Sequence, residues 1–250
     1  MTAHQAGVAV FICSSDNRRD VLDRVLPSVA KFWPDCPYPI YVGLNSMNRP
    51  LAIGTPLLAP ASEWHREFSS QLEHIPEERL IVLLDDYLLG MPVDQTRLSR
   101  LVEQAFAASI DYLRLVPLGR SLAARISGWH APEVSPGIER IRHDRPFYSG
   151  LQIAIWSKSH LQSMLQRPMT VWEFEHLCTP NSVHCAVKSH PPILYRHLVE
   201  QGRWLPHARM LLRRAGLHSE LGSRPVWSDS RYAKLILDRV QWTLWGYATS

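Results

Sequence analysis

The sequence predicts an α/β fold in which a mostly parallel central sheet is flanked by helices, with a small helical extension at the C-terminal end. Two short runs, at 8–13 and 80–84, consist only of apolar residues. Runs that are apolar on both faces are typical of strands buried within a sheet. Segments with apolar residues at helical spacing lie between these runs, and strands that alternate with helices favour parallel pairing. Polar residues follow both runs directly, at the strand end where such sheets bind ligands.

The first elements form a predicted β-α-β unit. The strand 8–13 is followed by polar residues at 14–17, which supply turn and N-cap chemistry for a helix over 18–32. The apolar residues of this helix recur at helical spacing, as its buried face requires. A second strand is expected at 40–44 and ends at Asn45.

The same periodicities predict the elements that follow. Strands are expected at 56–59, 80–84, 112–116 and 151–156, with a strand pair within 183–195, and helices at 64–72, 92–108, 157–166 and from 172. The stretch 117–146 is rich in Gly, Pro, Arg and His. It predicts a loop region or short antiparallel pairs, and connections of this length are often functional.

The composition limits the class of protein. With 250 residues, 46% hydrophobic and 20% charged, the chain can bury a full core in one large domain or one domain with an appendage. The net charge of +4 is spread along the chain and does not indicate nucleic-acid binding. Four irregularly spaced cysteines favour a reducing cytoplasm. No segment has the pattern of a signal peptide or the length of a membrane span, so membrane association would be peripheral, at the inner face of the cytoplasmic membrane.

The character of the chain changes after Gly202. Two basic amphipathic segments at 206–215 and 229–247 are separated by a Gly/Ser/Pro linker. We therefore divide the chain into a domain at 1–205 and a helical extension at 206–250. The last segment carries an apolar stripe and two tryptophans: Tyr232, Leu235, Ile236, Val240, Leu244, Trp242 and Trp245. It suits packing on its own domain or on a second copy in a homodimer, or contact with anionic lipid, and we favour packing.

Two carboxylates, Asp85 and Asp86, end the apolar run 80–84. Carboxylates in this position suit a divalent cation, Mg²⁺ or Mn²⁺, which offsets the charge of a diphosphate and stabilises it as a leaving group. An Asp-rich turn without a ligand is the alternative. Neither of the glycine-rich phosphate loops G-x-G-x-x-G and G-x-x-x-x-G-K-[ST] occurs. The turn after the first strand, Ser14-Ser15-Asp16, can hydrogen-bond a base or ribose without glycines.

A second acidic pair, Glu173 and Glu175, lies among aromatic residues. A carboxylate beside tryptophan in a partly dry cleft is made more basic, which a general base for a hydroxyl nucleophile requires. Residues two apart on a helix point to different sides, so the two cannot share one role. The alternative is a helix N-terminus whose acids complement the dipole.

Histidines and cysteines gather between 176 and 190, which raises the question of zinc. Their spacing fits none of the usual zinc patterns, so zinc is not predicted. The residues considered are His176, Cys178, His184, Cys185 and His190.

In order and spacing, four short motifs resemble the GT-A-type glycosyltransferases, particularly those of bacterial surface-polysaccharide (capsule and O-antigen) clusters. They are Ser14-Ser15-Asp16, Leu84-Asp85-Asp86, the segment 148–156 with Gln152, and the segment 172–175. The resemblance spans 8–204. It implies a nucleotide-binding half first, with Asp86 at the metal-binding position and Asp85 facing ribose or sugar. Leu84 departs from a full D-x-D motif, which puts metal dependence in question.

The resemblance also implies an activity, namely transfer of a sugar from a nucleotide-sugar donor to a saccharide or lipid-linked saccharide hydroxyl in polysaccharide biosynthesis. An inverting reaction needs a base on the acceptor side, for which we favour Glu175 over Glu173. Arg203 is expected to contact the diphosphate and His197 to act as a further donor. The donor-binding residues are then Ser14, Ser15, Asp16, Asp85, Gln152 and Arg203, with Asp86 for the metal.

Two other classes stay open. A nucleotidyltransferase acting on a sugar phosphate would have a similar sheet and acidic strand end, but it predicts a glycine-rich basic loop after the first strand. The segment 14–19 contains no glycine, which counts against it. The other class is a non-catalytic binding protein with the same fold.

Overall fold

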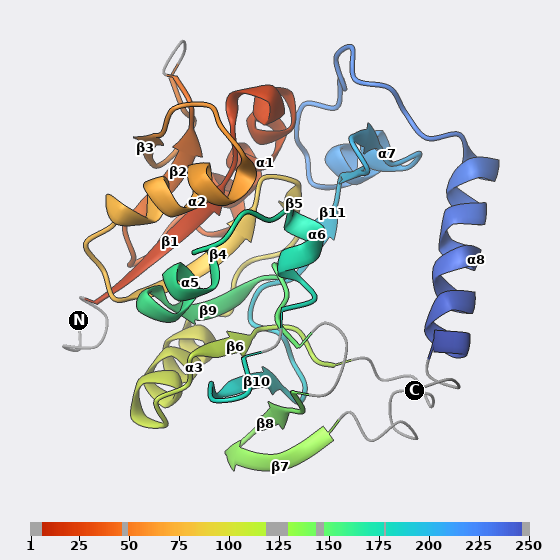
Figure 1. Ribbon diagram of the computed structural model, residues 1–250. Helices are drawn as coiled ribbons and strands as arrows, with labels where there is room; N and C mark the ends of the chain where they lie inside the picture. The colour runs from red at the N-terminus through yellow and green to blue at the C-terminus, as the bar shows by residue number, and fades with distance from the viewer. Residues whose placement is uncertain (1–6, 47–49, 119–129, 144–147, 178, 247–250) are drawn as a thin grey trace.

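A large twisted sheet with helices on both faces forms the centre of the molecule (Figure 1). The computed structural model describes residues 7–46, 50–118, 130–143, 148–177 and 179–246. In this part of the chain the main sheet has nine strands in the order β3-β2-β1-β4-β9-β6-β10-β8-β7. The α/β fold class predicted from the sequence is therefore confirmed.

The half of the sheet that carries the acidic strand end is parallel. It consists of β1 (Val8–Cys13), β2 (Ile40–Leu44), β3 (Thr55–Leu58) and β4 (Arg79–Leu84). β1 lies between β2 and β4 and is parallel to both. Cys13 is in register with Leu84, so the residues that follow both strands emerge side by side at the carboxyl edge.

The other half of the sheet is mixed. β9 (Ala154–Ser157) runs antiparallel to both of its neighbours, β4 and β6 (Tyr112–Arg114). β10 (His184–Val187) is parallel to β6. A hairpin of β7 (His130–Ser135) and β8 (Ile138–Ile141) closes this edge, so part of 117–146 is an antiparallel pair, as predicted. The segments 119–129 and 144–147 lie outside the described residues.

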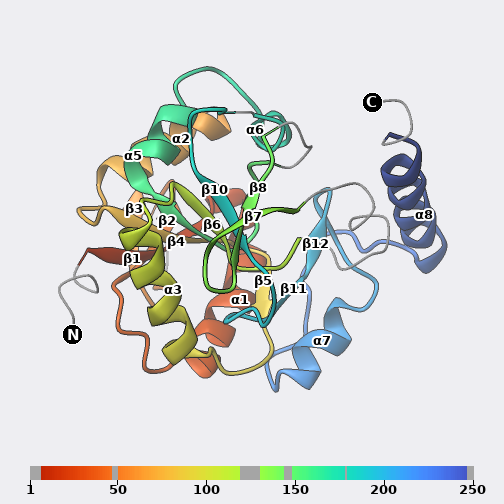
Figure 2. The same cartoon turned by 90° about the horizontal axis from the view of Figure 1, so that it is seen from below.

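Alternate residues of the strands supply the two faces of the core. Val10 of β1 lies in one cluster, together with residues of α1, α3 and α7, whereas Phe11 lies in the other, with residues of α2, α5 and α6. Figure 2 shows these two sets of helices on opposite sides of the sheet. The helices are α1 (Arg19–Phe32), α2 (Trp64–Glu73), α3 (Gln95–Ala107), α5 (Lys158–Met164), α6 (Val171–Phe174), α7 (Ala208–Arg214) and α8 (Asp229–Gly246), with a 3-10 turn, η1 (Asp16–Arg18), before α1.

Several predicted elements differ in extent or pairing, among them the strand predicted at 151–156, which begins at Ala154. α3 begins after Asp94, whose side chain accepts a hydrogen bond from the N–H of Arg97 and so caps the helix. α6 is a single turn. The predicted strand pair within 183–195 is wrong, because β10 joins the large sheet, whereas β11 (Tyr195–His197) pairs with β5 (Tyr87–Leu89). Two prolines and a positive φ at His190 separate β10 from β11 and turn the chain away.

The chain after β11 forms a small hairpin and two helices. β12 (Val199–Glu200) pairs with β13 (Arg203–Trp204). Ala208 and Leu212 of α7 are buried in the same core as α1, whereas α8 stands at the margin of the molecule (Figure 1). The boundary that we placed at residue 205 stays a prediction.

The stripe predicted on α8 is described only in part. Tyr232 and Leu235 are half-buried, and Tyr232 contacts the ring of His207, whereas Ile236 is 38% exposed. The other predicted stripe residues, Val240, Trp242, Leu244 and Trp245, have side chains outside those that the structure describes. Within the described chain, no helix combines the length and the apolar character that crossing a membrane requires.

Candidate active site

A cleft of about 1010 Å³ opens at the carboxyl ends of β1 and β4. Its walls come from η1, α2, the turn between β4 and β5, α6 and the tip of the β12–β13 hairpin. Seven of the residues proposed from the sequence line this cleft: Ser14, Ser15, Asp85, Asp86, Gln152, Glu175 and His197. The other three, Asp16, Glu173 and Arg203, are not among its lining residues.

Asp85 is held by two residues that follow β1. Its carboxylate accepts a hydrogen bond from Ser14 Oγ at 2.8 Å and pairs with the guanidinium of Arg18 through Nε and Nη2, the shortest contact being 2.7 Å. Burial raises the pKa of Asp85, and the charge and hydrogen bonds of Arg18 act against that rise. Burial also disfavours the charge on Arg18, but the ion pair outweighs it and raises the pKa of the guanidinium. The short contacts from Nε and Nη2 have the geometry of a charge-assisted pair.

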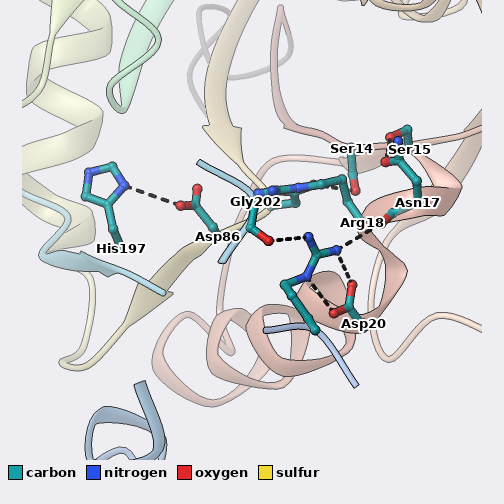
Figure 3. A network of polar contacts seen from close by, with 10 residues as sticks. Ser14, Ser15, Asn17, Arg18, Asp20, Asp86, His197 and Gly202 are labelled. Atoms are coloured by element: carbon teal, nitrogen blue, oxygen red, sulfur yellow. Dashed lines mark hydrogen bonds and ion pairs between the residues drawn. The ribbon is translucent and has the colours of Figure 1, made fainter. Parts of the chain in front are cut away.

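Asp86 is joined to the β11 strand. Its Oδ2 lies 3.4 Å from Nδ1 of His197, and its backbone oxygen accepts a hydrogen bond from the N–H of Leu198. The antiparallel register places His197 opposite Tyr87, the residue after Asp86. The His197 ring meets the Tyr87 ring edge-on, with 4.9 Å between the centroids. The β5–β11 pair therefore places an imidazole beside the second carboxylate (Figure 3).

Asp16 ties two strand ends together. Its side chain accepts hydrogen bonds from the backbone N–H groups of Asn45 and Ser46 and from Ser46 Oγ. The Asn45 side-chain oxygen accepts in return from the N–H of Asp16. The structure thus gives Asp16 a connecting role between the ends of β1 and β2, whereas its assignment to a base or ribose stays a prediction.

The two glutamates of α6 have different surroundings. Thr170 and Glu173 form a capping box, in which the Glu173 carboxylate accepts hydrogen bonds from the backbone N–H and Oγ1 of Thr170. These bonds hold the pKa of Glu173 below its usual value. Glu175 instead lines the cleft, where burial raises its pKa and a hydrogen bond from the N–H of Leu151 opposes that rise.

Trp172 extends the wall beside Glu175. It is 54% exposed and lines the cleft. Residues three apart on a helical turn lie on the same face, so Trp172 and Glu175 are neighbours, whereas Glu173 points elsewhere. The intervening Phe174 is fully buried against Trp64 and Trp156 and fixes the turn on the core. The capping box and this buried ring together position an aromatic face next to a carboxylate.

The β12–β13 hairpin at the mouth of the cleft is held by hydrogen bonds from Arg224. Its tip, Gln201-Gly202, has positive φ at both residues, as a tight hairpin turn requires. Arg224 donates hydrogen bonds to the backbone oxygens of Gly202 and Asn17, and it pairs with both carboxylate oxygens of Asp20 (Figure 3). It therefore joins two walls of the cleft, since Asn17 and Gly202 both line it. Arg203 stacks on the Trp227 ring at 5.6 Å.

The potential metal ligands of the cleft lie at the end of β4 and on β11. Asp86 and His197 supply a carboxylate oxygen and an imidazole nitrogen, and the oxygens of Asp85 are engaged by Arg18 and Ser14. Among the described residues, no group of three or more His, Cys, Asp or Glu side chains is placed to hold a metal. A cation bound through one carboxylate and its neighbour, with phosphate oxygens and water completing its shell, fits this donor set.

The histidines considered for zinc lie in three different places. His184 is fully buried on β10, where its Nε2 lies 2.8 Å from Nε2 of His160 on α5. His176 lines the cleft, and His190 is an exposed turn residue. Cys178 lies outside the described residues.

Sequence reasoning did not single out Arg18 or Gln71, which both line the cleft. Gln71 is 1% exposed, and its Oε1 has no partner among the described residues. The position of Arg18, directly after the polar turn that follows β1, was a usable signal. Nothing local marked Gln71, because its place depends on how α2 packs on the sheet.

Comparisons with known proteins bear on the fold only distantly. No family model matches the chain, and no curated protein matches it. A crystal structure of S. aureus TarS 1-349 is 12% identical over 83% of this chain and 70% of that chain, with a TM-score of 0.46. The chain covers 37% of the longer TarS structure. The bifunctional IspDF of Campylobacter jejuni is 11% identical over 76% of this chain and 52% of that chain, with a TM-score of 0.45. Glucosyl-3-phosphoglycerate synthase of Mycobacterium tuberculosis is 12% identical over 90% of this chain and 89% of that chain, with a TM-score of 0.36.

Proposed function

We propose that this chain is a glycosyltransferase that moves a sugar from a nucleotide-sugar donor to a hydroxyl group of a saccharide. The observation that carries the proposal is that Asp86 and Glu175 line one cleft, the first at the carboxyl end of a buried strand and the second on a helical turn. In this proposal the first serves the activated donor and the second serves the acceptor. The sequence motifs that resemble GT-A enzymes support the same assignment.

The donor half of the cleft lies at the ends of β1 and β4. Ser15 and Gln152 line it and offer neutral hydrogen-bonding groups. Asp86 and His197 would hold a divalent cation, Mg²⁺ or Mn²⁺. When bound, this cation would offset the negative charge that grows on the departing diphosphate.

The acceptor half lies at α6. The acceptor hydroxyl attacks the anomeric carbon as the bond from that carbon to the diphosphate oxygen breaks, and Glu175 takes the hydroxyl proton. The raised pKa of Glu175 makes it a better base than an ordinary carboxylate. The exposed face of Trp172 suits the apolar face of a sugar ring. Attack opposite the leaving group inverts the anomeric centre.

A bacterial surface-polysaccharide pathway with a lipid-linked saccharide acceptor is the setting that we propose for this reaction. The cleft extends to α8, because Tyr232 of that helix is one of its lining residues. A lipid-linked acceptor would then approach along α8.

The test is a panel of nucleotide-sugar donors offered with methyl glycosides as acceptors, in buffer with Mn²⁺. We expect release of a nucleoside diphosphate that depends on the acceptor, and its loss in Asp86→Asn. Release of pyrophosphate from a nucleoside triphosphate and a sugar phosphate would instead identify a nucleotidyltransferase. If the protein binds none of these compounds, it is not an enzyme of either class.

A further inference from the structure

Each of the two carboxylates at the end of β4 lies beneath a basic side chain. In the pair of Arg18 with Asp85, the side chains are 27% and 6% exposed. In the pair of His197 with Asp86, they are 48% and 7% exposed. The exposed member of each pair is thus the nitrogen-bearing one. The sequence predicted two carboxylates at the floor of the cleft, but the floor presents a guanidinium and an imidazole above them.

The oxygens of Asp85 are fully engaged by the protein. Arg18 Nε lies 3.1 Å from both oxygens, Arg18 Nη2 lies 2.7 Å from Oδ1, and Ser14 Oγ donates to Oδ2 at 2.8 Å. Three donor groups thus face the carboxylate, and the single Nε–H of Arg18 is shared between its two oxygens. Because the Asp85 side chain is only 6% exposed, a ribose hydroxyl or a cation could reach it only by displacing one of these donors, which would leave that donor unpaired.

Arg18 keeps one part of its guanidinium available. Its Nε and Nη2 face Asp85, while its Nη1 has no hydrogen-bond partner among the described residues. The side chain lines the cleft, and Figure 3 shows it between Ser14 and the Gly202 turn. The bidentate contact with Asp85 fixes the plane of the guanidinium, so little further ordering is needed when Nη1 binds a ligand.

We propose that Arg18 is a diphosphate-binding residue of this cleft and that Asp85 is its positioning residue rather than a contact to the donor. This inference rests on the proposed function, because it names the group that recognises the anionic part of the donor. A guanidinium held in one plane matches the oxygens of a phosphate, and such charge-assisted bonds are about twice as strong as neutral ones. Arg18 lies beside the site of Asp86 and His197, so the diphosphate contacts both.

Calorimetric titration with three kinds of probe tests the assignment, in buffer with Mn²⁺. The probes are the nucleoside diphosphates UDP, GDP, ADP and CDP, the corresponding nucleosides, and inorganic pyrophosphate. The variants are Arg18→Gln, Arg18→Lys and Asp85→Asn. Arg66→Gln is the control, since this exposed arginine of α2 forms only a surface ion pair with Glu63.

We expect Arg18→Gln to weaken the binding of the diphosphates and pyrophosphate at least about tenfold and to leave nucleoside affinity unchanged. Arg18→Lys should lose less diphosphate affinity than Arg18→Gln, because lysine keeps the positive charge but lacks the planar pair of N–H donors of a guanidinium. Asp85→Asn should weaken diphosphate binding less than Arg18→Gln does and should also spare the nucleosides. Arg66→Gln should behave as the wild type.

The opposite results separate this inference from the proposed function. Equal diphosphate affinity in wild type and Arg18→Gln overturns the role of Arg18 and leaves the function intact. If Arg18→Gln weakens the binding of nucleosides and diphosphates equally, the ion pair only supports the fold. If Asp85→Asn weakens only the binding of nucleosides, Asp85 contacts the ribose. Either result overturns the inference. If the wild type binds pyrophosphate but none of the nucleotides, the donor assignment is overturned and the role of Arg18 in binding phosphate stands. If the wild type binds none of the probes, both the proposed function and the role of Arg18 are overturned.

Discussion

The carboxylate of Glu175 accepts a hydrogen bond from the backbone N–H of Leu151, with 3.3 Å between the two atoms. Leu151 also lines the cleft, and its backbone oxygen accepts a hydrogen bond from the hydroxyl of the buried Tyr87, the residue that follows Asp86. The segment before β9 therefore connects the acceptor-side glutamate with the turn that carries the two aspartates. Glu173 has no such connection, because its carboxylate turns back onto Thr170.

Glu175→Gln should lower kcat about 10²–10⁴-fold, the usual contribution of a general base, while leaving the donor affinity unchanged. Glu173→Gln is the matched control, because glutamine also serves at this capping position and the turn should persist. Steady-state rates and donor titrations on both variants check this. If the Glu173 variant is the inactive one, the base has been assigned to the wrong carboxylate.

As the pH is lowered, kcat/KM should fall with a midpoint above the usual pKa of a glutamate. Burial raises the pKa of Glu175 above 4.5, and only the ionised form accepts a proton. Activity is therefore complete above the raised pKa and is lost as the pH falls through it. A pH profile on the wild type measures this midpoint. A midpoint at or below 4.5 would contradict the proposed base.

The contact between the half-buried His160 and the fully buried His184 should make the fold sensitive to acid. His184 Nδ1 donates to the backbone oxygen of Tyr148, so its Nε2 accepts from His160 Nε2. Burial lowers the pKa of His184 from 6.5 to about 3. Between these values the unfolded chain takes up a proton that the folded chain does not, so stability is complete above pH 6.5 and falls as the pH drops.

The free energy of unfolding should then be about 1.4 kcal/mol lower at pH 5.5 than at neutral pH from this residue alone. Denaturant titrations across this range measure the slope, and His184→Phe should flatten it. His218→Gln, at an exposed site, should keep the slope of the wild type. Identical slopes in wild type and His184→Phe would assign the acid sensitivity to other groups.

Arg224→Ala should lower the free energy of unfolding by about 1–3 kcal/mol, because it removes the paired contact with Asp20 and two bonds to backbone oxygens. Nucleoside diphosphate affinity should fall as well, since Asn17 and Gly202 line the cleft. Arg213→Ala is the control, as the side chain of this exposed arginine of α7 donates a hydrogen bond to Ser219 Oγ. If the folded Arg224→Ala variant binds nucleoside diphosphates as tightly as the wild type, the hairpin tip is held in place without Arg224.

Gly43→Ala should destabilise the protein by about 1–3 kcal/mol. A Cβ at Gly43 would overlap the side-chain amide of Gln71, which is buried between β2 and the cleft. Gly90→Ala, where a Cβ meets nothing within 4 Å, is the matched control. Thermal melts of both variants test this, and equal midpoints would mean that Gln71 moves aside without cost.

The sequence predicted those parts of the molecule that depend on local patterns. The apolar run before Asp85 and Asp86 forms the predicted strand, and a helical turn lies where a helix was predicted to start at residue 172. The partners of the two aspartates were not predictable in this way. Arg18 lies 67 positions from Asp85, and His197 lies 111 positions from Asp86. Such pairs are set by strand order and register, and no short window of sequence contains that information.

The most direct test of the donor site is a crystal structure of the protein with a nucleoside diphosphate and Mn²⁺. The account predicts density for the diphosphate in the cleft, in contact with Arg18, and a cation between the diphosphate and Asp86. A nucleotide bound elsewhere, for example in the open pocket beside Asp111 and His160, with the cleft empty at saturating concentration, would contradict it.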